Sequence, residues 1–267
     1  MQPTLHIGPE RNAGSVAGIG TRSYMKRGIL LTFAGLLLSA WGLVVWSAMH
    51  MAAPVVTLMM PMQSAWTLSE VAAVWMMWAV MMGAMMLPSA VPVVVIHSRV
   101  SSARGGEPGA ESRWFMAAYL VMWSFFSVAA AGLQWLLQFT GALSRMLVIT
   151  QGWLACALLI GAGLYQLTPA KFACLQRCRT PIGFFATEWR QGRFGAFRMG
   201  VRYGSYCVGC CWALMAVLFV FGAMNLAAIL VLTAGIAAEK LLPQGARTGQ
   251  ALGVMLIAWG LLLPFLR

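Results

Sequence analysis

The sequence predicts an all-α protein: a polytopic transmembrane helical bundle with about seven spans and a cytoplasmic N-terminus. Hydrophobic residues make up 61% of the 267 residues and charged residues only 9%, whereas a soluble globular domain carries about 25% charged residues. Apolar runs of about 20 residues, the length of a helix that crosses the hydrocarbon core, recur along the chain. The basic residues gather in every second connection between these runs, which predicts the orientation.

The seven predicted spans are apolar runs that are long enough to cross a bilayer as helices. The second is interrupted by Pro88 and Pro92, which weaken a helix and free backbone carbonyls. The stretch 205–238 is too long for one untilted helix, so we divide it near Gly222–Asn225, with one very long helix as the alternative. The spans lie near residues 28–48, 68–97, 114–138, 147–168, two within 205–238, and 248–266.

The placement of Lys and Arg predicts which side of the membrane each connection occupies. All of the 18 basic residues except Arg145 and Arg267 fall in the N-terminal tail or in the connections after the second, fourth and sixth spans. Cytoplasmic connections of inner (plasma) membrane proteins carry such an excess. The net charge of +12 therefore indicates orientation and contact with the lipid bilayer, and no nucleic-acid partner.

Two regions outside the spans have their own composition. Residues 1–27 begin with a Gly-rich, polar stretch without periodicity, which predicts a mobile N-terminal tail before a transmembrane helical domain over 28–267. The inner connection 170–203 mixes Phe and Trp with many Arg residues. That mixture is typical of a basic amphipathic segment on the membrane surface.

The second predicted span carries a run of methionines. Met81 and Met85 continue one stripe of a helix, and Met82 and Met86 form the adjacent stripe. Thioether sulfur is a soft, neutral ligand that favours Cu(I). The alternative is that these methionines fill irregular gaps between helices.

Five of the six cysteines lie within 38 residues, near the inner face of the predicted membrane. Cys174 and Cys178 are one helical turn apart. Cys207, Cys210 and Cys211 fit on one third of a helix surface. Disulfides are disfavoured on the reducing side of a membrane, which leaves metal binding, thiol redox chemistry or a structural role.

Glu239 ends the sixth predicted span beside Lys240. Ionisable groups at membrane depth are functional candidates, although this carboxylate could simply pair with its neighbour or face water. The topology brings Glu239, the methionine run and both cysteine groups toward the inner half of the bilayer. We therefore take all of them as candidate metal ligands.

Several functional classes are excluded by what the sequence lacks. It contains no Asp, so no aspartyl-phosphate pump, aspartic dyad or Ser-His-Asp triad is possible. It also has no Gly-rich phosphate loop with its Lys and Ser or Thr. Any movement of an ion must therefore run down a gradient or into a partner.

Six short segments resemble a known family of predicted metal-binding integral membrane proteins, domain of unknown function 2182. The resemblance covers roughly residues 70–260, and its most specific segments are Tyr165-Gln-Leu-Thr-Pro169 and Cys207-Val-Gly-Cys-Cys-Trp212. The resemblance implies a multi-helix membrane protein with a metal site, and no established reaction. The matching segments are 81–89, 165–171, 174–178, 195–200, 206–215 and 239–240.

The leading hypothesis is a membrane protein that binds a soft transition metal, Cu(I) first and zinc as the alternative, for transport or delivery. Its partner would be a metallochaperone or a membrane oxidase or monooxygenase complex. We expect binding and transfer rather than catalysis. Two alternatives remain: a membrane thiol oxidoreductase that uses the Cys207–Cys210 pair, and a non-catalytic accessory subunit of a membrane complex.

Overall fold

The computed structural model describes residues 13–61 and 65–266, and most of these residues are helical. Within those ranges the only β geometry is an isolated bridge between Leu143 and Ile149. The all-α prediction is therefore confirmed. The helices are α1 (Ala13–Met49), α2 (Pro54–Leu58), α3 (Leu68–Ala103), α4 (Pro108–Phe139), α5 (Gly152–Gln166), α6 (Pro169–Arg179), α7 (Pro181–Glu188), α8 (Gly192–Ala216), α9 (Leu218–Phe221), α10 (Leu226–Leu241) and α11 (Gly245–Leu266).

Five described segments are long and apolar enough to cross a membrane, and a bent pair raises the number to six. The bent pair is α5 with α6, which meet at 61° and replace the single predicted span at 147–168. The predicted count of seven is not confirmed, because α10 has 16 residues and a straight span needs about 20. The five segments are Leu30–Met49, Leu68–Ala103, Pro108–Phe139, Gly192–Phe221 and Gly245–Phe265.

The stretch 205–238 is divided near the place that the sequence predicts. The helix ends at Phe221, and Gly222 has a φ of 97°, which side-chain-bearing residues rarely adopt. Asn225 then caps α10, because its side-chain oxygen accepts the backbone N–H groups of Ala227 and Ala228. The chain reverses here, so α10 runs back beside the elements that precede it.

The predicted inner connection 170–203 is itself folded into helices. It comprises α6, α7 and the beginning of α8, which starts at Gly192 rather than near residue 205. Hydropathy missed this start because the first turns of α8 contain Arg193, Arg198 and Arg202. The predicted location of this segment on the membrane surface stays a prediction, as does the predicted mobile tail over 1–27, of which residues 1–12 lie outside the described part.

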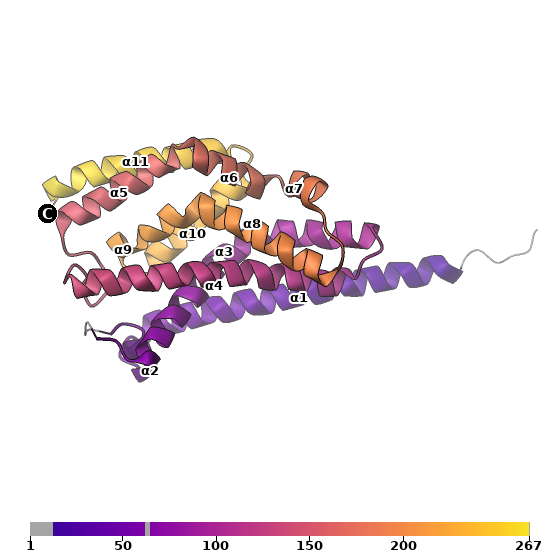
Figure 1. Ribbon diagram of the computed structural model, residues 1–267, viewed down its shortest axis with the longest axis horizontal. Coiled ribbons are helices and arrows are strands. Elements are labelled where there is room, and N and C mark those ends of the chain that lie inside the picture. The colour runs from indigo at the N-terminus through magenta and orange to yellow at the C-terminus, as the bar shows by residue number, and fades with distance from the viewer. Residues whose placement is uncertain (1–12, 62–64, 267) are drawn as a thin grey trace, which may run out of the picture.

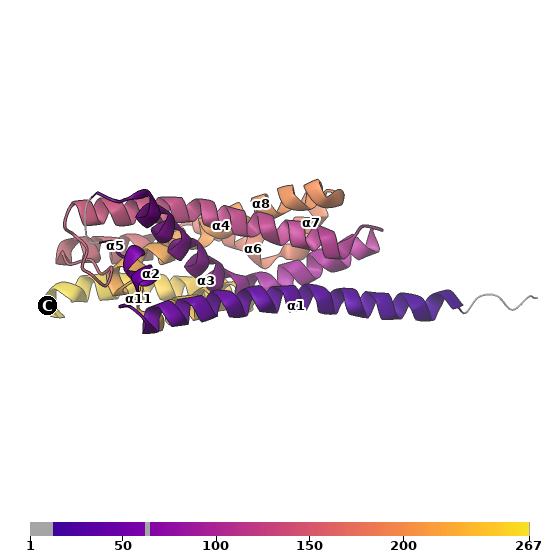
Figure 2. The same ribbon diagram turned by 90° about the horizontal axis from the view of Figure 1, so that it is seen from below.

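The long helices run along the long axis of the molecule (Figures 1 and 2). Among the candidate spans, those formed by α3 and by α8 with α9 are the most buried. In an 18-residue apolar stretch of each of these two spans, 61% of the residues are buried. The corresponding share for α1 is 11%. Figure 2 shows α1 along one edge, extending beyond the other helices. Chemically active side chains that need a dry environment are therefore best placed on α3 and α8.

On the opposite side of the bundle, α5 packs closely against α11 (Figure 1). A side-chain carbon at Gly163 would lie 2.6 Å from the carbonyl oxygen of Gly253, so only glycine permits this approach. This pairing holds α5 in place, and through it the bend into α6. The position of the α6 cysteines therefore depends on backbone packing at the far side of α5.

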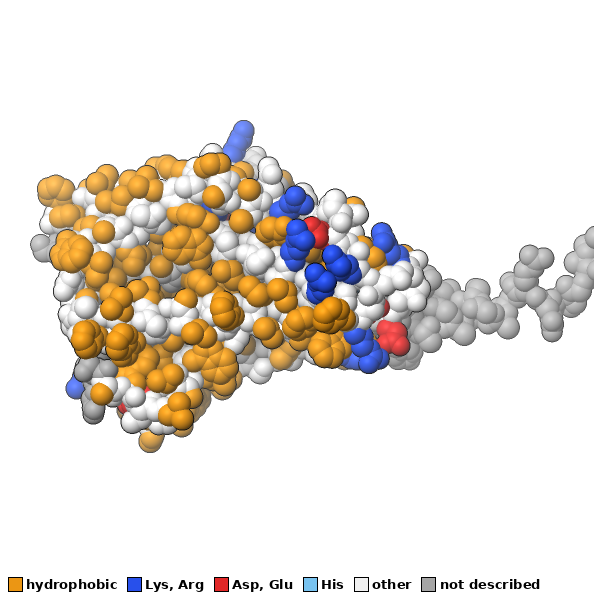
Figure 3. All heavy atoms as spheres, in the orientation of Figure 1, with side chains coloured by type: hydrophobic (Ala, Val, Ile, Leu, Met, Phe, Trp, Pro, Cys, Tyr) orange, Lys and Arg blue, Asp and Glu red, His pale blue; other side chains and the backbone are white. Residues whose placement is uncertain are grey.

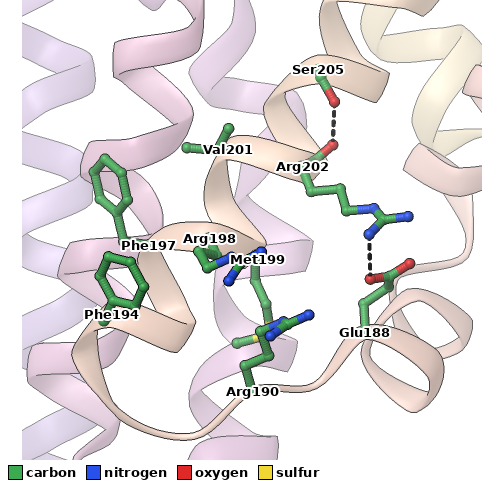
Figure 4. A pocket seen from close by; sticks show the side chains of 9 residues that line it. All are labelled: Glu188, Arg190, Phe194, Phe197, Arg198, Met199, Val201, Arg202 and Ser205. Atoms are coloured by element: carbon green, nitrogen blue, oxygen red, sulfur yellow. Dashed lines mark hydrogen bonds and ion pairs between the residues drawn. The ribbon is translucent and has the colours of Figure 1, made fainter.

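Most of the Lys and Arg side chains in view lie toward the end of the molecule opposite the C-terminus, and hydrophobic side chains are spread over the rest of the face (Figure 3). At this basic end a cavity of 440 Å³ opens beside the start of α8. Figure 4 shows Phe194 and Phe197 on one side of it, while Arg202 reaches Glu188 at 3.1 Å on the other. The arrangement puts aromatic and basic groups at one level, as the predicted membrane interface requires.

Candidate metal centre

Sulfur atoms from three helices meet inside the bundle. The Cys211 thiol on α8 lies 3.8 Å from the thioether sulfur of Met86 on α3. The Cys210 thiol, also on α8, lies 4.0 Å from the Cys178 thiol on α6. Cys207 lies beside these residues on α8, because its backbone carbonyl accepts from the Cys210 and Cys211 thiols. We call these five residues, Met86, Cys178, Cys207, Cys210 and Cys211, the sulfur cluster.

The three α8 cysteines face the same side because they are three and four residues apart on a helix. The thiols of Cys210 and Cys211 both donate to the backbone carbonyl of Cys207, at 3.1 and 2.8 Å. All members of the sulfur cluster are at most 5% exposed. Their reactive atoms are therefore shielded from solvent and are already gathered in one place.

A lysine from α10 reaches into the sulfur cluster. The ammonium nitrogen of Lys240 lies 2.9 Å from Sγ of Cys207, 3.7 Å from Sδ of Met86 and 3.3 Å from Oγ of Ser89. The hydroxyl of Tyr119 on α4 lies 3.0 Å from Sγ of Cys207. A buried cation and a phenol thus face the same sulfur atom.

Sequence reasoning missed both Lys240 and Tyr119. The sequence indicates Lys240 only as a partner for Glu239. Adjacent residues on a helix point in directions about 100° apart, so they do not face each other. This rule predicts that Glu239 and Lys240 point to different surroundings. In contrast, nothing in the sequence distinguishes Tyr119 from other tyrosines in apolar runs.

Glu239 lies in a separate, buried ion pair. One carboxylate oxygen accepts from Lys171 on α6 at 2.7 Å, and the other accepts from Gln166 on α5 at 2.7 Å. The Lys171 ammonium also donates to the side-chain oxygen of Gln166. Both oxygens of Glu239 are therefore already engaged, and its predicted role as a ligand stays a prediction.

The remaining predicted ligands lie next to the sulfur cluster. Cys174 is half-buried, and a side-chain carbon at Gly209 of α8 would lie 2.9 Å from its sulfur. Met81, Met82 and Met85 are at most 3% exposed and precede Met86 by less than two turns of α3. They therefore continue inside the bundle from Met86 toward the start of α3.

The donor set fits a soft metal ion of low charge. Thiol and thioether sulfur are the ligands that Cu(I) prefers, and thiolates also bind zinc. Among the described residues, no three His, Cys, Asp or Glu side chains already form a complete ligand set. Binding would therefore need small side-chain rotations or the thioether of Met86 as a further donor.

Comparison with known proteins gives the family. A family model described as PpoB2, copper chaperone, matches residues 75–263, which include every member of the sulfur cluster and Lys240. No curated protein and no solved structure matches the chain. The resemblance to domain of unknown function 2182 stays a prediction. Because the match extends over well more than half of the sequence, the chain belongs to the PpoB2 family of copper chaperones.

Proposed function

We propose that this protein is an integral membrane protein that binds Cu(I) at the sulfur cluster and delivers it to a partner protein. The observation that supports this most strongly is the convergence of four thiols and one thioether, from three helices, at a buried position. Soft sulfur ligands favour Cu(I) over harder ions. Membership of a copper chaperone family supports the same metal.

The distances within the sulfur cluster suit a shared ion. Two sulfur atoms that each lie about 2.3 Å from a metal, at a tetrahedral angle, are about 3.8 Å apart. The Cys211–Met86 and Cys210–Cys178 separations are 3.8 and 4.0 Å. Only small rotations are then needed to bring two or three sulfur atoms onto one ion.

Lys240 supplies the charge that such a complex lacks. Cu(I) bound by two thiolates has a net charge of −1, and a buried unpaired charge is costly. The Lys240 ammonium at 2.9 Å from Cys207 makes the assembly neutral. The second buried lysine, Lys171, is already neutralised by Glu239, so it is not available for this purpose.

The surroundings of the sulfur cluster suggest a direction of transfer. Met81, Met82 and Met85 form a thioether path that leads toward Met86, and thioethers bind more weakly than thiolates. Cys174 is the half-buried thiol beside the cluster, and we assign to it the transfer of the ion to a partner.

We further propose seven spans, a cytoplasmic N-terminus and a location in the inner (plasma) membrane. The acceptor would then be a metallochaperone or a membrane oxidase or monooxygenase complex.

The thiol oxidoreductase alternative has one observation in its favour, the 4.0 Å separation of the Cys178 and Cys210 sulfur atoms. Both thiols are at most 5% exposed, whereas redox-active thiols are partly accessible to their substrates. The accessory-subunit alternative gives no reason for four buried thiols, one of which lies 2.9 Å from a buried lysine. Copper delivery therefore explains more of the site.

The test is metal binding by the purified, detergent-solubilised chain. We expect single Cys207→Ser, Cys210→Ser and Cys211→Ser variants to lose Cu(I) affinity at least about tenfold in anaerobic competition with a Cu(I) chelator. Cys156→Ser is the matched control, because Cys156 lies on α5 outside the sulfur cluster. Unchanged copper and zinc content in all three cluster variants would refute the proposal, and loss of zinc alone would replace copper by zinc.

A further inference from the structure

A cavity of 200 Å³ lies beside the first half of α3. It is lined by the end of α1, by α2, by the first half of α3, and by the connection before α10 with the first turn of that helix. Five of its 14 lining residues are methionines, although methionine accounts for only 20 of the 267 residues in the chain. These methionines are Met59, Met76, Met77, Met81 and Met224.

Among the residues that the structure describes, no charged side chain lines this cavity. A strongly hydrated divalent cation has no carboxylate there to replace its water ligands. Thioethers, in contrast, are neutral and soft, and they suit a monovalent soft ion such as Cu(I). Met77, Met81 and Met224 are at most 7% exposed, whereas Met76 is 48% exposed. The cavity thus combines buried thioethers with an open rim, where Met76 is exposed.

The cavity and the proposed path share one residue. Met81 lines the cavity and is also the first residue of the thioether path. Met86, in the sulfur cluster, follows five residues later on α3, which corresponds to about 7.5 Å along the helix axis. From Met81 the path leads through Met82 and Met85 to Met86, which lies beside Cys211.

The rim of the cavity carries a further motif that the sulfur cluster does not use. Trp46 lines the cavity, and its ring stacks on His50 with centroids 5.2 Å apart. His50 lies between Met49 and Met51, and the Met49 side chain is 73% exposed. Imidazole and thioether groups thus lie just outside the cavity, where they would be the first ligands that an approaching ion contacts.

We propose that this methionine-lined cavity is a second, weaker Cu(I) site, from which the ion passes along α3 to the sulfur cluster. The proposal rests on the proposed function. Each step exchanges one copper–sulfur bond for another, so copper stays Cu(I). A thioether carries no proton, so none is released until a thiol of the cluster becomes a thiolate ligand. The cavity thereby takes up the ion, and the sulfur cluster retains it tightly.

The experiment compares Cu(I) stoichiometry in two matched triple variants of the full chain. Met76→Leu/Met77→Leu/Met224→Leu removes three cavity thioethers and keeps apolar side chains of similar volume. Met122→Leu/Met199→Leu/Met255→Leu removes three methionines outside both sites. Anaerobic titration with Cu(I) against a weak chelator should give two ions bound per native chain and per control chain, and one per cavity variant.

The cavity proposal and the proposed function fail in different ways. If the cavity variant still binds two ions with native affinities, the second site is refuted, whatever the cysteine variants show. If the cysteine variants keep the tight ion, the proposed function fails first. Should the triple variant elute as an aggregate, Met77→Leu and Met224→Leu are tested singly. Each should weaken the second ion at least threefold, and unchanged affinity in both would equally overturn the proposal.

Discussion

Lys240 and Cys207 come from different helices and meet at 2.9 Å inside the bundle. The contact joins a buried ammonium to a thiol of the sulfur cluster, and the backbone carbonyl of the same residue accepts from the Cys210 and Cys211 thiols. Since Lys240 also lies 3.7 Å from the Met86 sulfur, it adjoins both kinds of proposed ligand. The lysine is thus placed to balance the charge of a copper–thiolate complex.

Lys240→Met should therefore weaken Cu(I) binding. A complex of two thiolates with Cu(I) has a net charge of −1, which the ammonium balances and a neutral methionine side chain does not. We expect at least a tenfold loss of affinity, which is about 1.4 kcal/mol, in anaerobic chelator competition. Lys240→Arg should keep much of the affinity. A Lys240→Met variant with native affinity would show that the ammonium is not needed.

Lys171→Met should act on stability instead. It leaves the Glu239 carboxylate buried without its cation, and breaking a buried ion pair from one side costs about 3–5 kcal/mol. Thermal unfolding in detergent should show a clear decrease in Tm. The double variant Lys171→Met/Glu239→Gln should recover much of the loss. If the double variant is as unstable as the single one, the pair does not explain the effect.

Cys174→Ser should separate binding from delivery. Cys174 is half-buried beside the cluster, so we expect the tight ion to remain and its transfer to an added thiol acceptor to slow at least fivefold. Stopped-flow transfer to a chelator at matched loading measures the rate. Cys178→Ser, by comparison, should lower the affinity itself. An unchanged transfer rate in Cys174→Ser would place the exit elsewhere.

Thiol alkylation should follow the burial of each cysteine. A maleimide should modify Cys174 and Cys156 at least tenfold faster than the four thiols of the sulfur cluster, because those are at most 5% exposed. Mass spectrometry of the native, folded chain resolves the sites. Fast modification of Cys207 or Cys210 would favour the thiol oxidoreductase alternative.

The orientation is tested by reporter fusions. The distribution of Lys and Arg predicts an N-terminus in the cytoplasm and a C-terminus outside. A periplasmic phosphatase should therefore be active when fused after the last residue and inactive when fused before the first. The opposite pattern would reverse the proposed direction of transfer.

Much of the fold followed from simple sequence patterns, because apolar length and helical periodicity are local properties. The division near Gly222–Asn225 and the shared face of Cys207, Cys210 and Cys211 needed no tertiary information. Two features could not be predicted from the sequence: the 61° bend between α5 and α6, and the start of α8 at Gly192. Hydropathy indicates which residues are apolar enough to lie in a membrane, but it does not indicate how far a helix extends beyond them.

The site was predictable in its composition but not in its contacts. Soft sulfur at one membrane face is visible in the sequence, but which sulfur atoms touch depends on how the helices rotate and pack. Met86 rather than Met81, Met82 or Met85 meets Cys211 for this reason. Glu239 joins an ion pair, whereas Lys240 adjoins the sulfur cluster. This difference likewise depends on which side chains of α3, α6 and α8 face α10.

The most direct measurement is X-ray absorption at the copper edge on the purified chain loaded with one Cu(I). Copper delivery from the sulfur cluster predicts a shell of two or three sulfur atoms with no nitrogen or oxygen ligand, and its loss in a Cys207→Ser/Cys210→Ser variant but not in Cys156→Ser. A shell of nitrogen or oxygen ligands, or an identical sulfur shell in the double variant, would contradict it.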